Sequence, residues 1–179
     1  MRKKVSGSGR WRFGRFLRDT KGATALEFAI VATPFLFTLF AILEVALIFF
    51  GSSALESGVQ AAARTIRTRE LQLSGGGLAE FRTQLCAQAA GLIACDTRLN
   101  IDVRTYPSFA GADMTPPVDA LGNPIPGPFD PGGPEQVVVV KAYYVWKIYT
   151  PGLGLLLGNI GSSNSRLLLS TAAFRNEPS

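Results

Sequence analysis

The sequence contains no histidine, only two cysteines and few charged side chains. Histidine is absent from all 179 residues, and charged residues make up 17% of the chain. The usual general base near neutral pH is therefore missing, as are zinc and haem sites that contain histidine. Two cysteines can form one disulfide but cannot hold a structural zinc ion alone. We expect one modest domain, with no metal ion and no cofactor.

Catalytic motifs are also missing from the sequence. It contains no G-x-S-x-G segment, no P-loop and no G-x-G-x-x-G segment after a strand. Asp102, Asp113, Asp119 and Asp130 are spread over an expected strand and loop, so we expect solvated carboxylates that are too sparse to bind calcium. The chain is therefore predicted not to be an enzyme.

The positive charge is concentrated at the N-terminus. Residues 1–21 carry a net charge of +7 and the remainder carries −2. Aromatic and apolar side chains alternate with these basic residues, a pattern that would also suit a nucleic acid. The apolar run that follows favours contact with an anionic membrane surface, so no nucleic-acid partner is expected.

Residues 28–50 form an almost uninterrupted apolar run. Its only charged residue is Glu44, and as a helix it would be about 35 Å long, enough to cross a hydrocarbon core of about 30 Å. Fifteen Leu, Ile, Val or Phe residues outweigh the cost of one acidic group, about 3 kcal/mol. A buried helix of a soluble protein is the alternative, and a signal peptide would have a shorter apolar region. We predict a transmembrane helix over 23–50.

The flanking charges predict the orientation of this helix. Short basic flanks stay in the cytoplasm, so the leader 1–22 is expected there and the residues after about 51 in the periplasm. Beyond Gly51 an amphipathic stripe predicts a helical extension over 51–73, ended by the glycine run at 75–77. We expect a single helix from Thr24 to Leu73, in which Pro34 would either cause a kink or open a local gap in the hydrogen bonding. The stripe consists of Leu55, Val59, Ala62 and Ile66.

The remaining residues, 78–179, predict a small α+β domain with an antiparallel sheet. A short helix is expected from Leu78 to about Gly91. Strands are expected over 99–104, 136–149 and 166–174, the second of them central. The segment 107–135 holds eight prolines and five glycines and should be a long exposed loop without regular structure. Residues 153–157 are apolar and would be either core or a patch for the membrane surface or a partner.

Cys86 and Cys95 are nine residues apart on the expected periplasmic side. In an oxidising compartment they could close a small loop that contributes about 2–3 kcal/mol. A redox-active pair is the alternative, although the spacing is not C-x-x-C. We favour the structural disulfide.

The residues around Gly22 resemble the processing site of type IV prepilins, with a basic leader, a glycine, a carboxylate five residues later and a long apolar helix. More closely, the stretch GATALEFAIVATPFLFTLFAILEVALIFF, Ala61–Arg64 and the terminal FRNEP segment resemble the TadE-like family of pseudopilins from tight-adherence pilus systems. The resemblance implies cutting between Gly22 and Ala23 by an aspartic prepilin peptidase, residence in the inner membrane, and a minor role in building a Flp-type pilus. It also implies other pilus subunits and the inner-membrane assembly platform as partners.

The chemistry of these residues fits that role. Gly22 allows an extended backbone in a protease cleft. Cutting would leave an ammonium on Ala23 that Glu27, one turn on and beside Phe28, could neutralise within the chain or between subunits. The alternative is a capping box, in which Thr24 caps the helix and Glu27 reaches back to it.

Pro34 and Glu44 are the expected helix-packing residues within the membrane. An acidic group in a span must be protonated, paired or turned into a bundle. The alternative for Glu44 is that it lies near the far interface and reaches water.

We expect the chain to function in assembly through helix packing. The alternatives are an unprocessed single-pass scaffold of a secretion or adhesion complex and, more weakly, a membrane-anchored periplasmic hydrolase.

Overall fold

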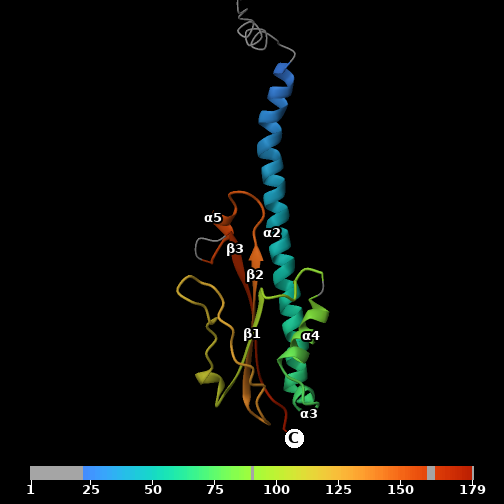
Figure 1. The fold of residues 1–179 in the computed structure, drawn as a ribbon, viewed down its shortest axis with the longest axis vertical. Helices are drawn as coiled ribbons and strands as arrows, with labels where there is room; N and C mark the ends of the chain where they lie inside the picture. Colours follow the sequence, from blue (N-terminus) through green and yellow to red (C-terminus); the bar gives the residue numbers. More distant parts are fainter. Residues whose placement is uncertain (1–21, 90, 161–163, 179) are drawn as a thin grey trace, which may run out of the picture. The chain divides into compact units, whose positions relative to one another are not determined.

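A computed structural model describes residues 22–89, 91–160 and 164–178 (Figure 1). The basic leader of residues 1–21 lies outside the described residues, as does its predicted contact with an anionic membrane surface. The chain divides into two compact units, one ending at Phe40 and the other beginning at Ala41, and each is described by itself.

The long helix α2 extends from Ala23 to Arg67 and continues through Pro34. It ends before Leu73, so the single helix expected over 24–73 is wrong. The cause is Arg69, whose φ of 60° is left-handed and interrupts the helical hydrogen bonds; a separate short helix, α3, follows over Glu70–Leu73. The Ile66 carbonyl near the end of α2 accepts two hydrogen bonds, from the Arg69 amide at 3.0 Å and from the side chain of Gln72, which turns back to donate at 3.1 Å.

The sheet has three antiparallel strands in the order β1–β2–β3. They are β1 (Leu99–Tyr106), β2 (Val137–Lys147) and β3 (Ser165–Arg175). All three strands were predicted, and β2 is central as expected. Together with α2 and the shorter helix α4 (Leu78–Gln88), they confirm the α+β class.

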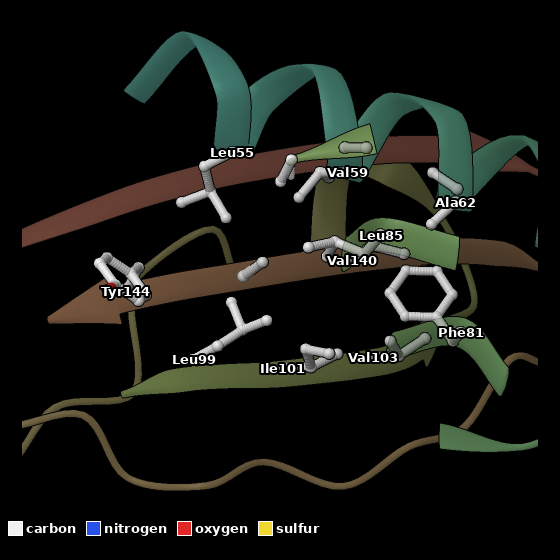
Figure 2. Close-up of a cluster of buried hydrophobic side chains, with 14 of the residues drawn as sticks. Leu55, Val59, Ala62, Phe81, Leu85, Leu99, Ile101, Val103, Val140 and Tyr144 are labelled. Carbon is white, nitrogen blue, oxygen red and sulfur yellow. The ribbon is translucent and has the colours of Figure 1, made fainter. Parts of the chain in front are cut away.

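One face of the sheet packs against α2 and α4 to form the core (Figure 2). The predicted stripe of Leu55, Val59, Ala62 and Ile66 is fully buried there. Phe81 and Leu85 of α4 complete the layer between α2 and the sheet. We call residues 70–178, which include α3, α4, the sheet and their loops, the head.

The loop 107–135 is more ordered than the sequence suggested. It contains a short 3₁₀ helix, Phe109–Gly111, and an isolated bridge that pairs Phe129 with Val103. Val103 donates to the Pro128 carbonyl and accepts from the Asp130 amide, both at 2.9 Å. The expectation of an exposed irregular loop is therefore wrong at this point, because the free edge of β1 offers hydrogen-bonding groups that the loop can satisfy.

The absence of a side chain at Gly58 allows α2 and α4 to pack closely together. A Cβ there would lie 2.8 Å from the carbonyl oxygen of Leu85 and 3.3 Å from the Cβ of Ala89. We predict that Gly58→Val pushes the helices apart and lowers the free energy of unfolding by about 1–3 kcal/mol. Ser57→Val, at the neighbouring exposed position, is the matched control. Denaturant unfolding of the full chain in detergent, followed by tryptophan fluorescence, measures both; equal effects would contradict the packing role.

Candidate functional site

The first part of α2, residues 23–40, presents apolar side chains on all sides. Its large apolar residues are exposed, Phe28 for example by 74%. Among the described residues, α2 is the helix long and apolar enough to cross a membrane, and only 17% of its most apolar 18-residue window is buried. A core helix of a soluble protein would have this window covered by protein. The helix therefore has the surface of a membrane anchor.

The expected processing residues lie at the start of this helix. Gly22 is exposed, and among the described residues beyond its chain neighbours no atom lies within 4 Å of where its Cβ would be. Ala23 is the first residue of α2. Glu27 and Phe28 are exposed one turn further on. Thr24 lies inside the helix rather than ahead of it, so the capping box with Thr24 as N-cap is not formed.

Glu44 lies at the junction between α2 and the head. Its side chain is only 6% exposed, so it does not reach water as the interfacial alternative required. The carboxylate oxygen Oε2 accepts three hydrogen bonds from the segment after β2: from the amide of Tyr149 at 3.2 Å, the amide of Thr150 at 3.1 Å and the hydroxyl of Thr150 at 3.0 Å. These three donors satisfy the buried carboxylate oxygen, which would otherwise lack a hydrogen-bond partner. Glu44 thus ties the apolar helix to the head.

The side of α2 that carries Glu44 continues the buried stripe toward the N-terminus. Ile48 is buried, and Gly51 lies against the ring of Trp146, whose Cζ3 would be 2.7 Å from an added Cβ. Contact with the head therefore begins at Glu44, inside the segment 23–50 that the sequence predicted to span the membrane. Up to residue 43 the helix is exposed around most of its circumference, and from residue 44 it is covered on one side.

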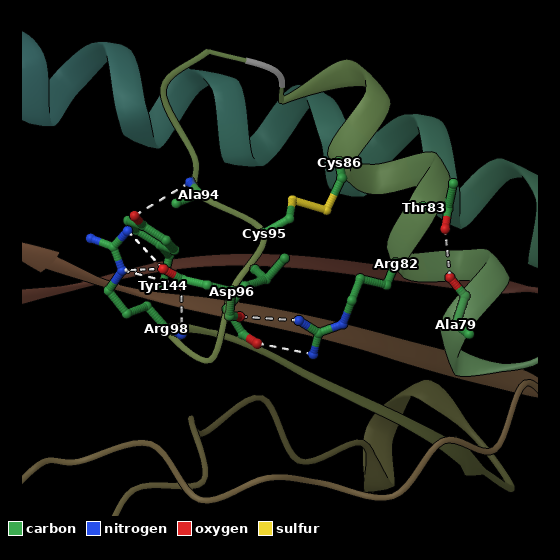
Figure 3. The surroundings of a disulfide bond; sticks show 10 residues. Ala79, Arg82, Thr83, Cys86, Ala94, Cys95, Asp96, Arg98 and Tyr144 are labelled. Atoms are coloured by element: carbon green, nitrogen blue, oxygen red, sulfur yellow. Dashed lines mark hydrogen bonds and ion pairs between the residues drawn. A yellow bond between two sulfur atoms is a disulfide. The ribbon is translucent and has the colours of Figure 1, made fainter.

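The disulfide between Cys86 and Cys95 joins α4 to the loop that leads into β1 (Figure 3). Arg82, one turn before Cys86, donates to the carbonyls of Asp96 and Leu99 at 3.3 and 3.1 Å. Asp96 is paired with Arg98, and this hydrogen bonding lowers the pKa of the aspartate. The bond and these contacts hold α4 against the start of β1, in agreement with the structural role that we favoured from the sequence.

A buried polar cluster lies on the other face of the sheet. Asp102 and Lys141 face each other in the β1–β2 register, and both are fully buried. Arg104 Nε donates to both oxygens of Asp102, at 2.8 and 3.1 Å, while Lys141 Nζ donates to the Thr115 carbonyl at 2.8 Å and lies 3.8 Å from Asp102 Oδ2. Burial raises the pKa of the neighbouring Tyr143, and the charge of Asp102 adds to this effect.

The expectation that Asp102 is solvated is therefore wrong. The loop 107–135 covers this face, and Gly127 lies so close to Asp102 that a side chain at 127 would collide with the carboxylate. The sequence held one signal, Lys141 within the apolar run of β2, because a lysine in a buried strand needs an acidic or carbonyl partner. Asp113 and Asp119 are exposed, as expected, and accept hydrogen bonds within their own turns. No cluster of three or more His, Cys, Asp or Glu suited to a metal ion occurs among the residues that the structure describes.

These features define a class of protein: a small α+β head carried on an N-terminal helix that is apolar enough to span a membrane. Residues 22–64 match the family model of the TadE-like proteins, so the resemblance predicted from the sequence is confirmed over this segment. The match begins at Gly22, the expected processing glycine, and contains Glu27, Pro34 and Glu44. Comparison with curated proteins and with solved structures found no match.

The polar cluster yields a prediction for stability. Asp102→Ala removes the acidic partner of Lys141 and should lower the free energy of unfolding by about 3 kcal/mol, because it leaves a buried cation without its counter-charge. The double variant Asp102→Leu/Lys141→Met removes both charges and should recover more than half of that loss. Asp113→Ala, an exposed aspartate from the covering loop, is the control. A double variant no more stable than the single one would contradict the pairing.

The junction at Glu44 yields a second prediction. Hydrogen bonds to a charged group contribute about 1.5–3 kcal/mol, so Glu44→Leu should speed the exchange of the Tyr149 and Thr150 amides by about tenfold or more. Glu44→Gln keeps a carbonyl acceptor and should have a smaller effect. Site-resolved hydrogen exchange measures both, with the amide of Val140 in β2 as the internal control. Unchanged exchange at 149 and 150 in the leucine variant would show that Glu44 does not hold this segment.

Proposed function

We propose that this chain is a minor pilin or pseudopilin that acts, without catalysis, in the assembly of a Tad/Flp pilus. The observation that carries the proposal is that the family match and the exposed apolar helix fall on the same residues. The TadE-like match covers 22–64, and the exposed apolar part of α2 falls within it. Other pilus subunits are the partners that the family suggests.

The N-terminus is proposed to be processed between Gly22 and Ala23 by a prepilin peptidase. Exposure of Gly22 and the free space around it would let the chain enter a protease cleft. The new ammonium on Ala23 would stand at the positive end of the α2 dipole, where Glu27, one turn on, could neutralise it. In lipid such a pair would fix the register between packed helices more than it would add stability.

The proposed topology places the leader in the cytoplasm and the head in the periplasm of a bacterial inner membrane. The net charge of +7 before the helix supports this orientation. The Cys86–Cys95 disulfide is consistent with it, because such bonds persist in oxidising compartments. An inner-membrane assembly platform would then contact the chain from the cytoplasmic side, and neighbouring subunits would pack along α2.

Assembly would use the exposed side chains of α2. Before assembly these side chains would face lipid, and in a bundle they would pack against equivalent helices, with little change in hydrophobic free energy. Polar groups therefore have to specify the arrangement. In this proposal Glu27 is that polar group, and Pro34 adds a place where the helix can bend, while Glu44 already has partners in its own head.

Processing gives the direct test. In cells that carry a Tad system, the mature chain should begin at Ala23 and be about 22 residues shorter than the precursor, whereas Gly22→Leu should accumulate as the full-length precursor, because a bulky side chain obstructs the cleft. Gly77→Leu, at an exposed glycine far from the site whose backbone is extended, is the control. Intact mass and N-terminal sequencing measure the outcome. A wild-type chain that keeps its leader would favour the unprocessed membrane scaffold over the pilin.

A further inference from the structure

The loop after β2 exposes apolar side chains that its own head does not cover. It contains the short helix α5 (Gly154–Leu157), where Leu155 is 91% and Leu156 79% exposed. Tyr149, at the start of the loop, is also exposed. Figure 1 shows α5 near the end of the sheet at which β2 finishes. A small head rarely presents neighbouring leucines to water without a use for them.

The Glu44 junction fixes this loop at a known level on α2. The hydrogen bonds to the amides of Tyr149 and Thr150 place the start of the loop beside residue 44. From Ala23 to residue 43 the helix is about 31 Å long, close to the thickness of a hydrocarbon core of about 30 Å. The far lipid boundary therefore falls near Glu44, and the loop 149–157 lies at that boundary.

The apolar surface of α2 continues past this level on the side away from the head. Leu47, Phe49 and Phe50 are exposed there. These side chains extend the apolar surface of α2 by one to two turns past Glu44, the residue beside which the loop begins. Aromatic side chains such as Tyr149 are favoured where acyl chains meet headgroups.

The charge of this part of the head suits an anionic membrane surface. No Asp or Glu occurs from Gln136 to Asn176, whereas Lys147 and Arg166 lie next to the loop. Lys147 Nζ lies 5.9 Å from the centre of the Tyr149 ring, and Arg166 donates to the Leu157 carbonyl at 2.9 Å. Both cations are therefore close to where phospholipid phosphates would be.

We propose that the loop 149–157 is a second membrane contact, in which Leu155 and Leu156 enter the outer boundary of the bilayer while Lys147 and Arg166 face anionic headgroups. This inference rests on the proposed membrane anchoring by α2. With this contact the head would be held against the lipid surface, whereas an anchor helix alone would leave the distance between the head and the bilayer unrestricted.

The test uses the full chain, with its disulfide intact, in vesicles of phosphatidylcholine and phosphatidylglycerol. A nitroxide is attached to a single new cysteine in Leu156→Cys, Phe37→Cys or Leu121→Cys. Collision rates with oxygen, which concentrates in lipid, and with a water-soluble nickel chelate report the depth of each label. The ratio of oxygen to nickel collisions should be severalfold higher at 156 and at 37 than at 121, which lies in the loop 107–135. Adding Leu155→Asp to the labelled 156 chain should lower the ratio at 156 toward that at 121.

The outcomes separate this inference from the anchoring on which it rests. A label in lipid at 37 but in water at 156 would overturn the membrane contact and leave the anchor intact. A label in water at 37 would overturn the anchor and the contact together. Spin–spin broadening at 156 that disappears when labelled chains are diluted with unlabelled ones would show that a second copy covers the leucines, and would also overturn the proposal.

Discussion

The central constraint on this structure is that one helix, α2, exposes apolar side chains over its first part and packs against the head over its second part. From Phe28 to residue 43, α2 exposes apolar side chains on all sides, and from Glu44 onward one side carries a buried stripe that packs against the sheet and α4. The change occurs at a carboxylate that accepts three hydrogen bonds from Tyr149 and Thr150. A charged group is costly in lipid, so its partners in the head make its position on the helix tolerable.

The head is stabilised differently on its two sides. Toward α2 it has an ordinary apolar core, helped by the close approach at Gly58 and by the Cys86–Cys95 bond. On the other side a polar cluster is closed by the loop 107–135, whose glycine at 127 allows the backbone to lie against Asp102. Three strands with one helical layer would leave this second face open to water. The proline-rich loop supplies the missing cover.

The apolar helix, the amphipathic stripe, the three strands and the order of the sheet could all be predicted from the sequence. Each rests on a local pattern of periodicity or on composition, which does not require knowledge of distant residues. The TadE-like segment was likewise recognisable from residues that are continuous in the chain. The end of α2 at Arg67 was not, because a left-handed arginine at 69 carries no glycine or proline signal.

Local sequence patterns were thus enough to predict the α+β class, a helix apolar enough to cross a membrane, and the cysteine pair. The roles of Glu44 and Asp102 became visible only in the folded chain. Both are acidic residues in apolar surroundings, and the same local pattern fits a snorkelling or solvated side chain. Their partners, Thr150 and Lys141, lie 106 and 39 positions further on in the chain. Folding brings such groups together through long-range packing, which short-range sequence patterns do not encode.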